Sequence, residues 1–185
     1  MRSLLLMALF TIGCNAIGQK VPVQVSKTEK DAYGIRLDAP KGVYQYAFRI
    51  GEWESISKTL KTRYEWLSDT GRFRVYVAEN GLTYIEEILD ANGEIKYKTT
   101  YDYVESTDSW ENDYMDMVTG ESVKFTSKFT NGSMVEKIKR TDNENNNTYT
   151  IVAENIVLYT ANRTYLNGFS IITHVGIATK ILNHE

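Results

Sequence analysis

Two stretches of the sequence place aromatic and polar side chains at alternate positions. Tyrosines recur at odd positions in residues 95–103, and aromatic and polar residues alternate with their neighbours in residues 110–116. Alternation with a period of two is typical of a β-strand that buries one face. The side chains expected to share the buried face are Tyr97, Tyr101, Tyr103, Trp110, Asn112, Tyr114 and Asp116.

These side chains could form a ligand site, because aromatic walls with a few polar tips are the usual form of a small-molecule pocket. We predict that they line a cavity that takes one small, partly apolar ligand. The alternative is a solid interior, in which the aromatic rings fill the space and each hydroxyl bonds to a neighbour.

Acid–base catalysis would need a carboxyl group with a raised pKa and a second group across the substrate. Glu86 and Glu87 are adjacent, so a strand turns them to opposite faces. Asp116 is the one carboxylate that we expect to point inward, and it is the only catalytic candidate. A single inward carboxylate is more often a hydrogen-bonded structural group, so we assign no catalytic residue.

Other kinds of chemistry have no motif in the sequence. It contains no Gly-x-Ser-x-Gly elbow, no glycine-rich phosphate loop and no clustered zinc or calcium ligands. In residues 169–177, one face is predicted to carry Phe169, Ile171, Thr173, Val175 and Ile177 inward. That alternation turns His174 outward, away from any haem inside, and we expect neither a metal nor another cofactor.

The composition is that of one compact domain. The chain has 185 residues, of which 42% are hydrophobic and 24% charged, with a single cysteine and a net charge of −3. These figures exclude collagen-like, disordered and disulfide-stapled proteins. The slightly acidic balance provides no basic field for nucleic acid.

From Tyr44 onward the sequence alternates with a period of two, and Asn-Gly pairs at 80–81, 92–93, 131–132 and 167–168 favour tight hairpins. No substantial helix is expected. Nine or ten hairpin-linked strands could form a sandwich or a barrel, and closure removes the exposed edges of a long meander. We predict an all-β fold, an antiparallel up-and-down meander closed into a barrel of about 8–10 strands. Residues 19–43 would form a lead-in, with an irregular strand or a short helix across a barrel end, and residues 44–185 the barrel.

A family resemblance follows from three groups of residues. The Gly-x-Trp motif within Phe48–Glu54 is similar to the start of lipocalins and their calycin relatives. The order of 98–103, then 110–116, then the strand around Phe125 before Asn131-Gly132 resembles a secreted bacterial family of lipocalin-like barrels of unassigned function. The resemblance covers roughly residues 44–181.

The resemblance implies a barrel with a cavity and a small apolar ligand, and it implies no chemistry. Lipocalins commonly pair the motif tryptophan with a basic residue from a late strand. By this resemblance Trp53 would close the narrow end of the barrel, and Arg163 would be its partner.

The first eighteen residues are typical of an export signal. Arg2 precedes an uncharged apolar run of nine residues, Leu4–Ile12, which is too short to span a bilayer. Cleavage after Gly18 is one interpretation. A lipobox that ends at Cys14, whose side chain would then carry a lipid anchor, is the other. Either interpretation predicts an exported protein in the periplasm or cell envelope of a bacterium, or a secreted one.

The sequence therefore favours an exported binding protein for a small, partly apolar molecule. An isomerase, cyclase or hydro-lyase that uses an inward Asp or Tyr is the first alternative. A solid barrel that docks on another envelope component is the second.

The position of the mature N-terminus tests the export signal. We expect a chain that begins at Gln19, or at an acylated Cys14, because these follow the two cleavage patterns. Intact mass spectrometry of protein from the envelope fraction measures this directly. A product that retains Met1–Phe10 would contradict both patterns.

Overall fold

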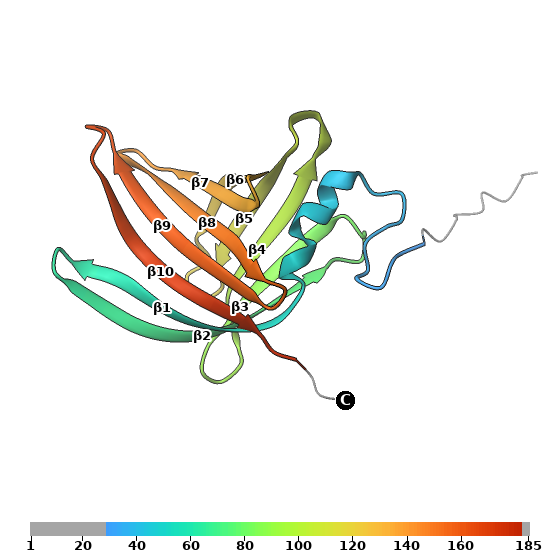
Figure 1. The fold of residues 1–185 in the computed structure, drawn as a ribbon, viewed down its shortest axis with the longest axis horizontal. Helices are drawn as coiled ribbons and strands as arrows, with labels where there is room; N and C mark the ends of the chain where they lie inside the picture. Colours follow the sequence, from blue (N-terminus) through green and yellow to red (C-terminus); the bar gives the residue numbers. More distant parts are fainter. Residues whose placement is uncertain (1–28, 183–185) are drawn as a thin grey trace, which may run out of the picture.

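The computed structural model describes residues 29–182 and shows ten strands preceded by one short helix (Figure 1). The elements are η1 (Lys41–Arg49), β1 (Gly51–Thr62), β2 (Glu65–Val77), β3 (Thr83–Leu89), β4 (Ile95–Val104), η2 (Glu105–Thr107), β5 (Ser109–Asp116), β6 (Ser122–Thr130), β7 (Ser133–Lys139), β8 (Asn143–Ala153), β9 (Ile156–Tyr165) and β10 (Ser170–Lys180).

Each strand pairs antiparallel with the next along the chain, and β1 pairs with β10 to close the barrel. This confirms the predicted all-β meander, with ten strands. The Asn-Gly signals work as expected at the β6–β7 hairpin, where Asn131 and Gly132 both have positive φ, 50° and 76°. A type I′ turn needs positive φ at both central residues. Among residues 29–182, the helices are too short and too polar to cross a bilayer.

The helix η1 corrects the expectation that strand structure starts at Tyr44, because β1 begins only at Gly51. The buried residues of η1 are Val43, Tyr46 and Arg49, which are three apart. Side chains at this spacing eclipse one another on a 3₁₀ helix and so share one face. The helix lies across one end of the barrel (Figure 1).

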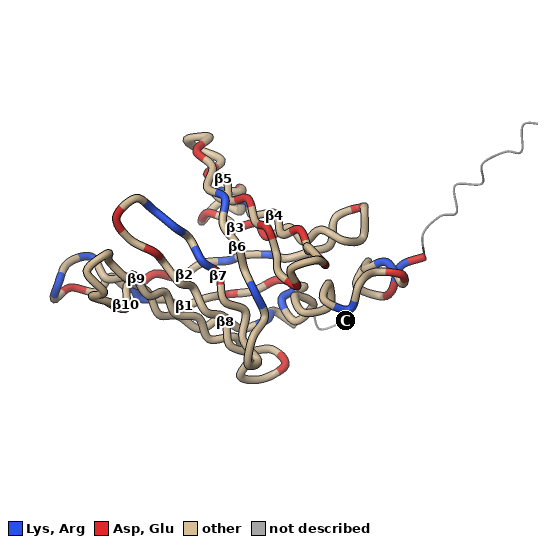
Figure 2. Tube along the Cα trace, turned by 90° about the horizontal axis from the view of Figure 1, so that it is seen from above, with Lys and Arg blue, Asp and Glu red and all other residues tan. Residues whose placement is uncertain are grey.

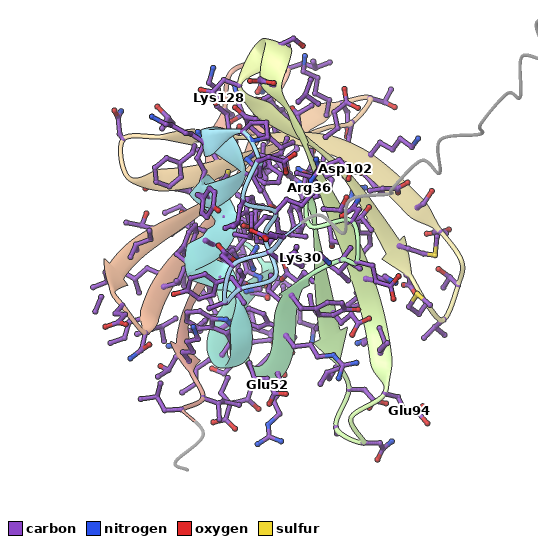
Figure 3. All side chains as sticks on the ribbon, turned by 90° about the vertical axis from the view of Figure 1, so that its right-hand side faces the viewer. Lys30, Arg36, Glu52, Glu94, Asp102 and Lys128 are labelled. Atoms are coloured by element: carbon purple, nitrogen blue, oxygen red, sulfur yellow. The ribbon has the colours of Figure 1, made fainter. Side chains whose placement is uncertain are left out.

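The end of the barrel under η1 is filled by side chains (Figure 3). The Tyr84 hydroxyl donates a 3.0 Å hydrogen bond to the Val43 carbonyl, and the Tyr46 and Trp110 rings meet edge to face at 5.0 Å. The fully enclosed cluster comprises Ile35, Val43, Tyr46, Val75, Tyr84, Tyr101, Trp110 and Met134. This end is therefore solid, and any hollow must lie toward the opposite end.

Trp53 lies in a second small core, where it is 1% exposed and stacks on Phe73 at 6.0 Å. Its indole N–H donates to the Arg49 carbonyl at 2.8 Å, which fastens η1 to β1. Arg163 is not its partner, contrary to the implication of the resemblance. Arg163 pairs with the start of β10, whereas Trp53 pairs with Lys180 at the end of that strand. At about 3.3 Å per residue, these two positions along β10 are about 30 Å apart. The cation near the Trp53 ring is Lys180, whose Nζ lies 5.9 Å from the ring centre.

A β-bulge in β10 changes which of its residues face inward. Ile172 pairs with Asn162 and His174 with Ala161, so Thr173 is an extra residue in the ladder. An extra residue shifts the alternation by one position beyond it. The prediction of an inward Ile177 is wrong, since that residue is 39% exposed. Gly176 faces inward instead of Val175, because a Cβ on it would lie 2.5 Å from the Tyr159 ring inside the barrel.

Candidate functional site

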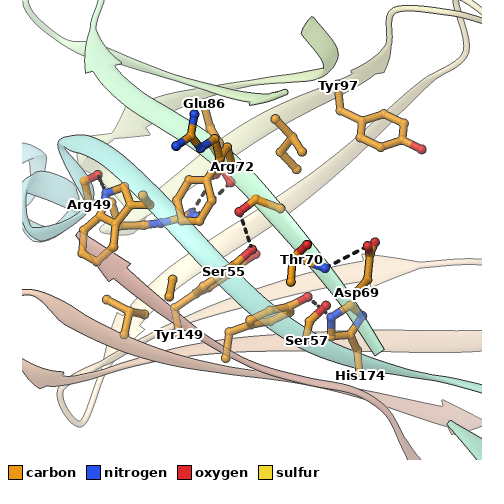
Figure 4. Close-up of a pocket in the computed structure, with 17 residues that line it drawn as sticks. Arg49, Ser55, Ser57, Asp69, Thr70, Arg72, Glu86, Tyr97, Tyr149 and His174 are labelled. Atoms are coloured by element: carbon orange, nitrogen blue, oxygen red, sulfur yellow. Dashed lines mark hydrogen bonds and ion pairs between the residues drawn. The ribbon is translucent and has the colours of Figure 1, made fainter. Parts of the chain in front are cut away.

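The barrel is hollow beyond the core under η1. A cavity of about 270 Å³, here called the inner cavity, lies beside the Arg49–Glu86 pair (Figure 4). Its walls are mainly apolar and include Trp53, Phe73, Ile88, Val157 and Tyr159. A concave apolar surface with a few polar groups is the usual form of a small-molecule site.

Two further spaces continue the inner cavity toward the end of the barrel opposite η1. The middle cavity, about 340 Å³, shares Glu86, Tyr149, Tyr159 and His174 with the inner one. The mouth pocket, about 650 Å³, shares Ala161 and His174 with the middle cavity. The shared lining residues place the three spaces next to one another, from the buried ion pair to the mouth; together they are here called the hollow, and His174 lines all three.

The innermost polar group of this hollow is a buried ion pair. Arg49 Nη1 lies 2.8 Å from one Glu86 oxygen, and Nη2 donates to the other at 2.9 Å, with both side chains less than a tenth exposed. The guanidinium also lies 4.3 Å from the centre of the Tyr149 ring. The 3₁₀ spacing of η1 brings Arg49 inward, and Glu86 follows the alternation of β3.

A second carboxylate, Glu136 of β7, is 2% exposed. It accepts hydrogen bonds from the Tyr46 hydroxyl at 3.2 Å, the Asn147 amide at 3.0 Å and the Tyr149 hydroxyl at 3.2 Å. Burial raises the pKa of the Glu136 carboxyl, although Arg49 acts in the opposite direction. The Tyr101 hydroxyl donates to Glu86 at 2.7 Å and so links the two carboxylates.

The expectation that Asp116 is the one inward carboxylate is therefore wrong, because Glu86 and Glu136 are both inside. Asp116 ends β5, and its Oδ1 accepts the N–H groups of Val118 and Thr119 at 2.9 and 3.0 Å. These bonds hold the pKa of Asp116 below its ordinary value, whereas a general acid needs a raised one. Asp116 stabilises a turn.

The other predicted site residues divide between the hollow and the core. Tyr97 lines the inner cavity, and Tyr101 and Tyr114 line the middle one. Tyr103 and Trp110 lie nearer η1, where their rings meet at 5.2 Å.

Asn112 is also inside, and its side-chain amide forms a 2.9 Å hydrogen bond with the Ser127 hydroxyl. The structure thus brings three of the predicted tyrosines to the hollow, Tyr97, Tyr101 and Tyr114. Cys14 lies outside the described residues.

Sequence reasoning missed Arg49, Glu86 and Glu136. A signal existed for the carboxylates, since Tyr84, Glu86 and Ile88 alternate on β3 as Met134, Glu136 and Ile138 do on β7. In both strands the glutamate occupies a position between two inward apolar residues. For Arg49, the spacing of three residues from Tyr46 and of six from Val43 indicates a shared face on a 3₁₀ helix. Alternation with a period of two, expected from Tyr44 onward, does not reveal that shared face.

His174 also faces inward, which corrects the prediction that it points out. Its Nδ1 lies 2.9 Å from the Thr59 hydroxyl, and its Nε2 contacts the Tyr159 hydroxyl. Burial lowers the pKa of this imidazole. With both nitrogens engaged by hydroxyl groups, the ring as placed offers no lone pair to an iron. Among residues 29–182, no three His, Cys, Asp or Glu side chains are grouped to hold a metal ion.

Comparison with known proteins returned structural neighbours only. No protein-family model matches the chain, and no curated protein matches it significantly in sequence. The S-type phycobiliprotein lyase CPES from Guillardia theta superposes with a TM-score of 0.49 at 9% identity, over 76% of this chain and 91% of that one. Rv2717c from M. tuberculosis gives 0.49 at 10% identity, over 78% and 100%. The strand order supports a lipocalin-like barrel, and no specific family is assigned.

Removing the charge of Arg49 tests the buried ion pair. We expect Arg49→Met to lower the free energy of unfolding by about 3 to 5 kcal/mol, because it leaves Glu86 buried without its cation. Arg49→Met combined with Glu86→Met should recover much of that loss, since no unpaired charge remains. Urea unfolding at pH 7 measures both. A double variant no more stable than Arg49→Met would contradict this account.

The titration of His174 tests its inward position. We expect a pKa below the ordinary 6.5, because the half-buried ring is harder to charge. The folded protein then binds fewer protons than the unfolded chain just below pH 6.5, so stability should fall as the pH drops through that window. NMR titration of the imidazole signal, assigned with His174→Gln, measures the value. A pKa at or above 6.5 would contradict the expected effect of burial on this ring.

Proposed function

We propose that this protein binds one small, partly apolar molecule inside its barrel. The observation that carries the proposal is the set of adjoining cavities inside the barrel, of which the inner one has walls of Trp53, Phe73, Ile88 and Val157. Small-molecule sites have volumes of roughly 300–1,000 Å³; the inner cavity, at about 270 Å³, lies just below that range, and the middle cavity, at about 340 Å³, lies within it. A solid barrel that acts only through its surface would have no use for this space.

The energetics allow useful affinity. Burial of apolar ligand surface contributes about 25 cal/mol per Å², so a few hundred Å² supply several kcal/mol. A micromolar complex needs about 8 kcal/mol, which is within reach when the walls are already in place. Here they are held by the closed ladder and the buried polar cluster.

Binding is better supported than catalysis. Glu136 lines the middle cavity with a raised pKa, as a general acid would. However, the Tyr46, Asn147 and Tyr149 side chains already donate to its two oxygens. Glu86 is likewise occupied by Arg49 and Tyr101. Groups engaged in this way fix the shape and polarity of a site.

The place of action is part of the proposal. Export to the bacterial envelope or beyond rests on the pattern of residues 1–18, which lie outside the described residues. A carrier of a partly apolar molecule would suit that location, since such molecules cross water poorly.

A substitution that fills the inner cavity tests the function. Ser57 lines this cavity from β1, while Ile56 points outward with 64% exposure. We expect wild-type protein to bind the neutral dye N-phenyl-1-naphthylamine with one-to-one stoichiometry. Ser57→Phe should weaken the binding at least about tenfold, because the new ring takes up the ligand's space.

The matched control is Ile56→Phe, which adds a ring on the outer face of the same strand and should leave dye affinity unchanged. Fluorescence titration and thermal melting of each variant separate loss of binding from loss of folding. Non-saturable dye binding, or equal effects of the two variants, would show that the dye does not occupy the barrel.

A further inference from the structure

The mouth pocket differs from the rest of the hollow in its charge. Its lining contains the cations Lys61, Arg63 and Arg163, and none of the described residues that line it is a carboxylate. The chain as a whole carries a net charge of −3, so this concentration of positive charge is local. Figure 2 shows Lys and Arg, together with some Asp and Glu, at the hairpin tips on the left, the end away from η1.

These cations have few strong partners within residues 29–182. Arg163 Nε donates to the neutral amide oxygen of Asn145 at 3.2 Å. Lys61 Nζ lies 3.6 Å from Glu65, but both side chains are about half exposed, and such pairs contribute little. Arg63 lies 5.6 Å from the centre of the Tyr64 ring. Their charge is therefore still able to attract an anion.

The arginine deep in the hollow is already paired, since Arg49 is bound to Glu86. Arg72 also lines the inner cavity, but its side chain is largely exposed and donates to Glu54 at 2.8 Å. The middle cavity adds the buried carboxylate Glu136, and only Arg140, near the mouth end of β7, brings a further positive charge. An anion would thus meet attraction at the mouth and carboxylates farther in.

We propose that the ligand is an amphipathic anion, bound with its acidic group in the mouth pocket and its apolar part toward the inner cavity. The inference rests on the proposed function and adds the chemical class and the orientation of the ligand. A carboxylate, sulfonate or phosphate would suit the site, because a guanidinium binds such groups through two parallel hydrogen bonds. The apolar part would pass Ala161 and His174, which line both the mouth pocket and the middle cavity.

A pair of dyes with the same skeleton separates charge from shape. 1-Anilinonaphthalene-8-sulfonate carries a sulfonate, and N-phenyl-1-naphthylamine lacks it. We expect the sulfonate to bind at least about tenfold more tightly at 50 mM salt, with the advantage falling at 500 mM because salt screens exposed charges. Arg163→Gln should weaken sulfonate binding about tenfold, a change of 1.4 kcal/mol, and change neutral-dye binding less than twofold.

The control variant is Lys124→Gln, which removes an exposed lysine from β6 outside the hollow. Lys124→Gln should leave both dye affinities unchanged. If the sulfonate bound to the surface through general electrostatic attraction, this variant would weaken its binding as well. If neither dye binds saturably, the proposed function fails. If the neutral dye binds but the sulfonate has no advantage, or Arg163→Gln weakens both dyes equally, the barrel binds ligands and the anion proposal is overturned.

Displacement of the neutral dye identifies the kind of anion. Dodecanoate or dodecyl phosphate should displace it at lower concentrations than dodecanol, which has the same chain without the charge. Equal displacement by the three would overturn the proposal. So would co-sedimentation with phosphatidylglycerol vesicles without any displacement by dodecanoate, since the cations would then serve a membrane surface.

Discussion

The burial of the Arg49 guanidinium inside the barrel is the interaction on which the rest of the structure depends. Taking a charge out of water costs several kcal/mol unless it is paired and hydrogen-bonded, so the surroundings must meet it closely. Glu86 of β3 supplies two contacts, and the Tyr149 ring of β8 covers the guanidinium. The backbone carbonyl of Arg49 accepts the Trp53 N–H of β1. One residue of η1 thereby joins three strands and holds the helix over the barrel end.

This arrangement also sets the polarity of the hollow. Because Arg49 is bound to Glu86, the hydrogen bonds to the second carboxylate, Glu136, come from neutral donors, and burial raises the pKa of Glu136 although Arg49 acts in the opposite direction. Apolar walls surround the inner cavity beside this polar centre, and the basic mouth lies at the far end of the hollow. A ligand inside therefore meets a different environment at each end, which would fix its direction.

Sequence alternation predicted the fold and part of the site, and its failures have definite physical causes. It gives the face of a strand to which a residue points, and so it placed Tyr97, Tyr101 and Tyr114 correctly on the inside. It does not give the depth along the barrel, which depends on the end that η1 covers. Trp110 also points inward, but it lies at the end of the barrel that side chains fill. There the same alternation gives a core residue and not a cavity wall.

The bulge at Thr173 shows how much of the interior a single residue can determine. If β10 paired without the bulge, unbroken alternation along the same sequence would turn His174 and Gly176 outward and Val175 and Ile177 inward. The Tyr159 ring occupies the space that a side chain at Gly176 would need, and its hydroxyl meets His174. The bulge therefore puts a glycine and an imidazole inside the barrel in place of two aliphatic side chains, and the imidazole lies where the middle cavity adjoins the mouth pocket. Bulges are common beside functional sites for this reason: they re-aim side chains while the ladder stays closed.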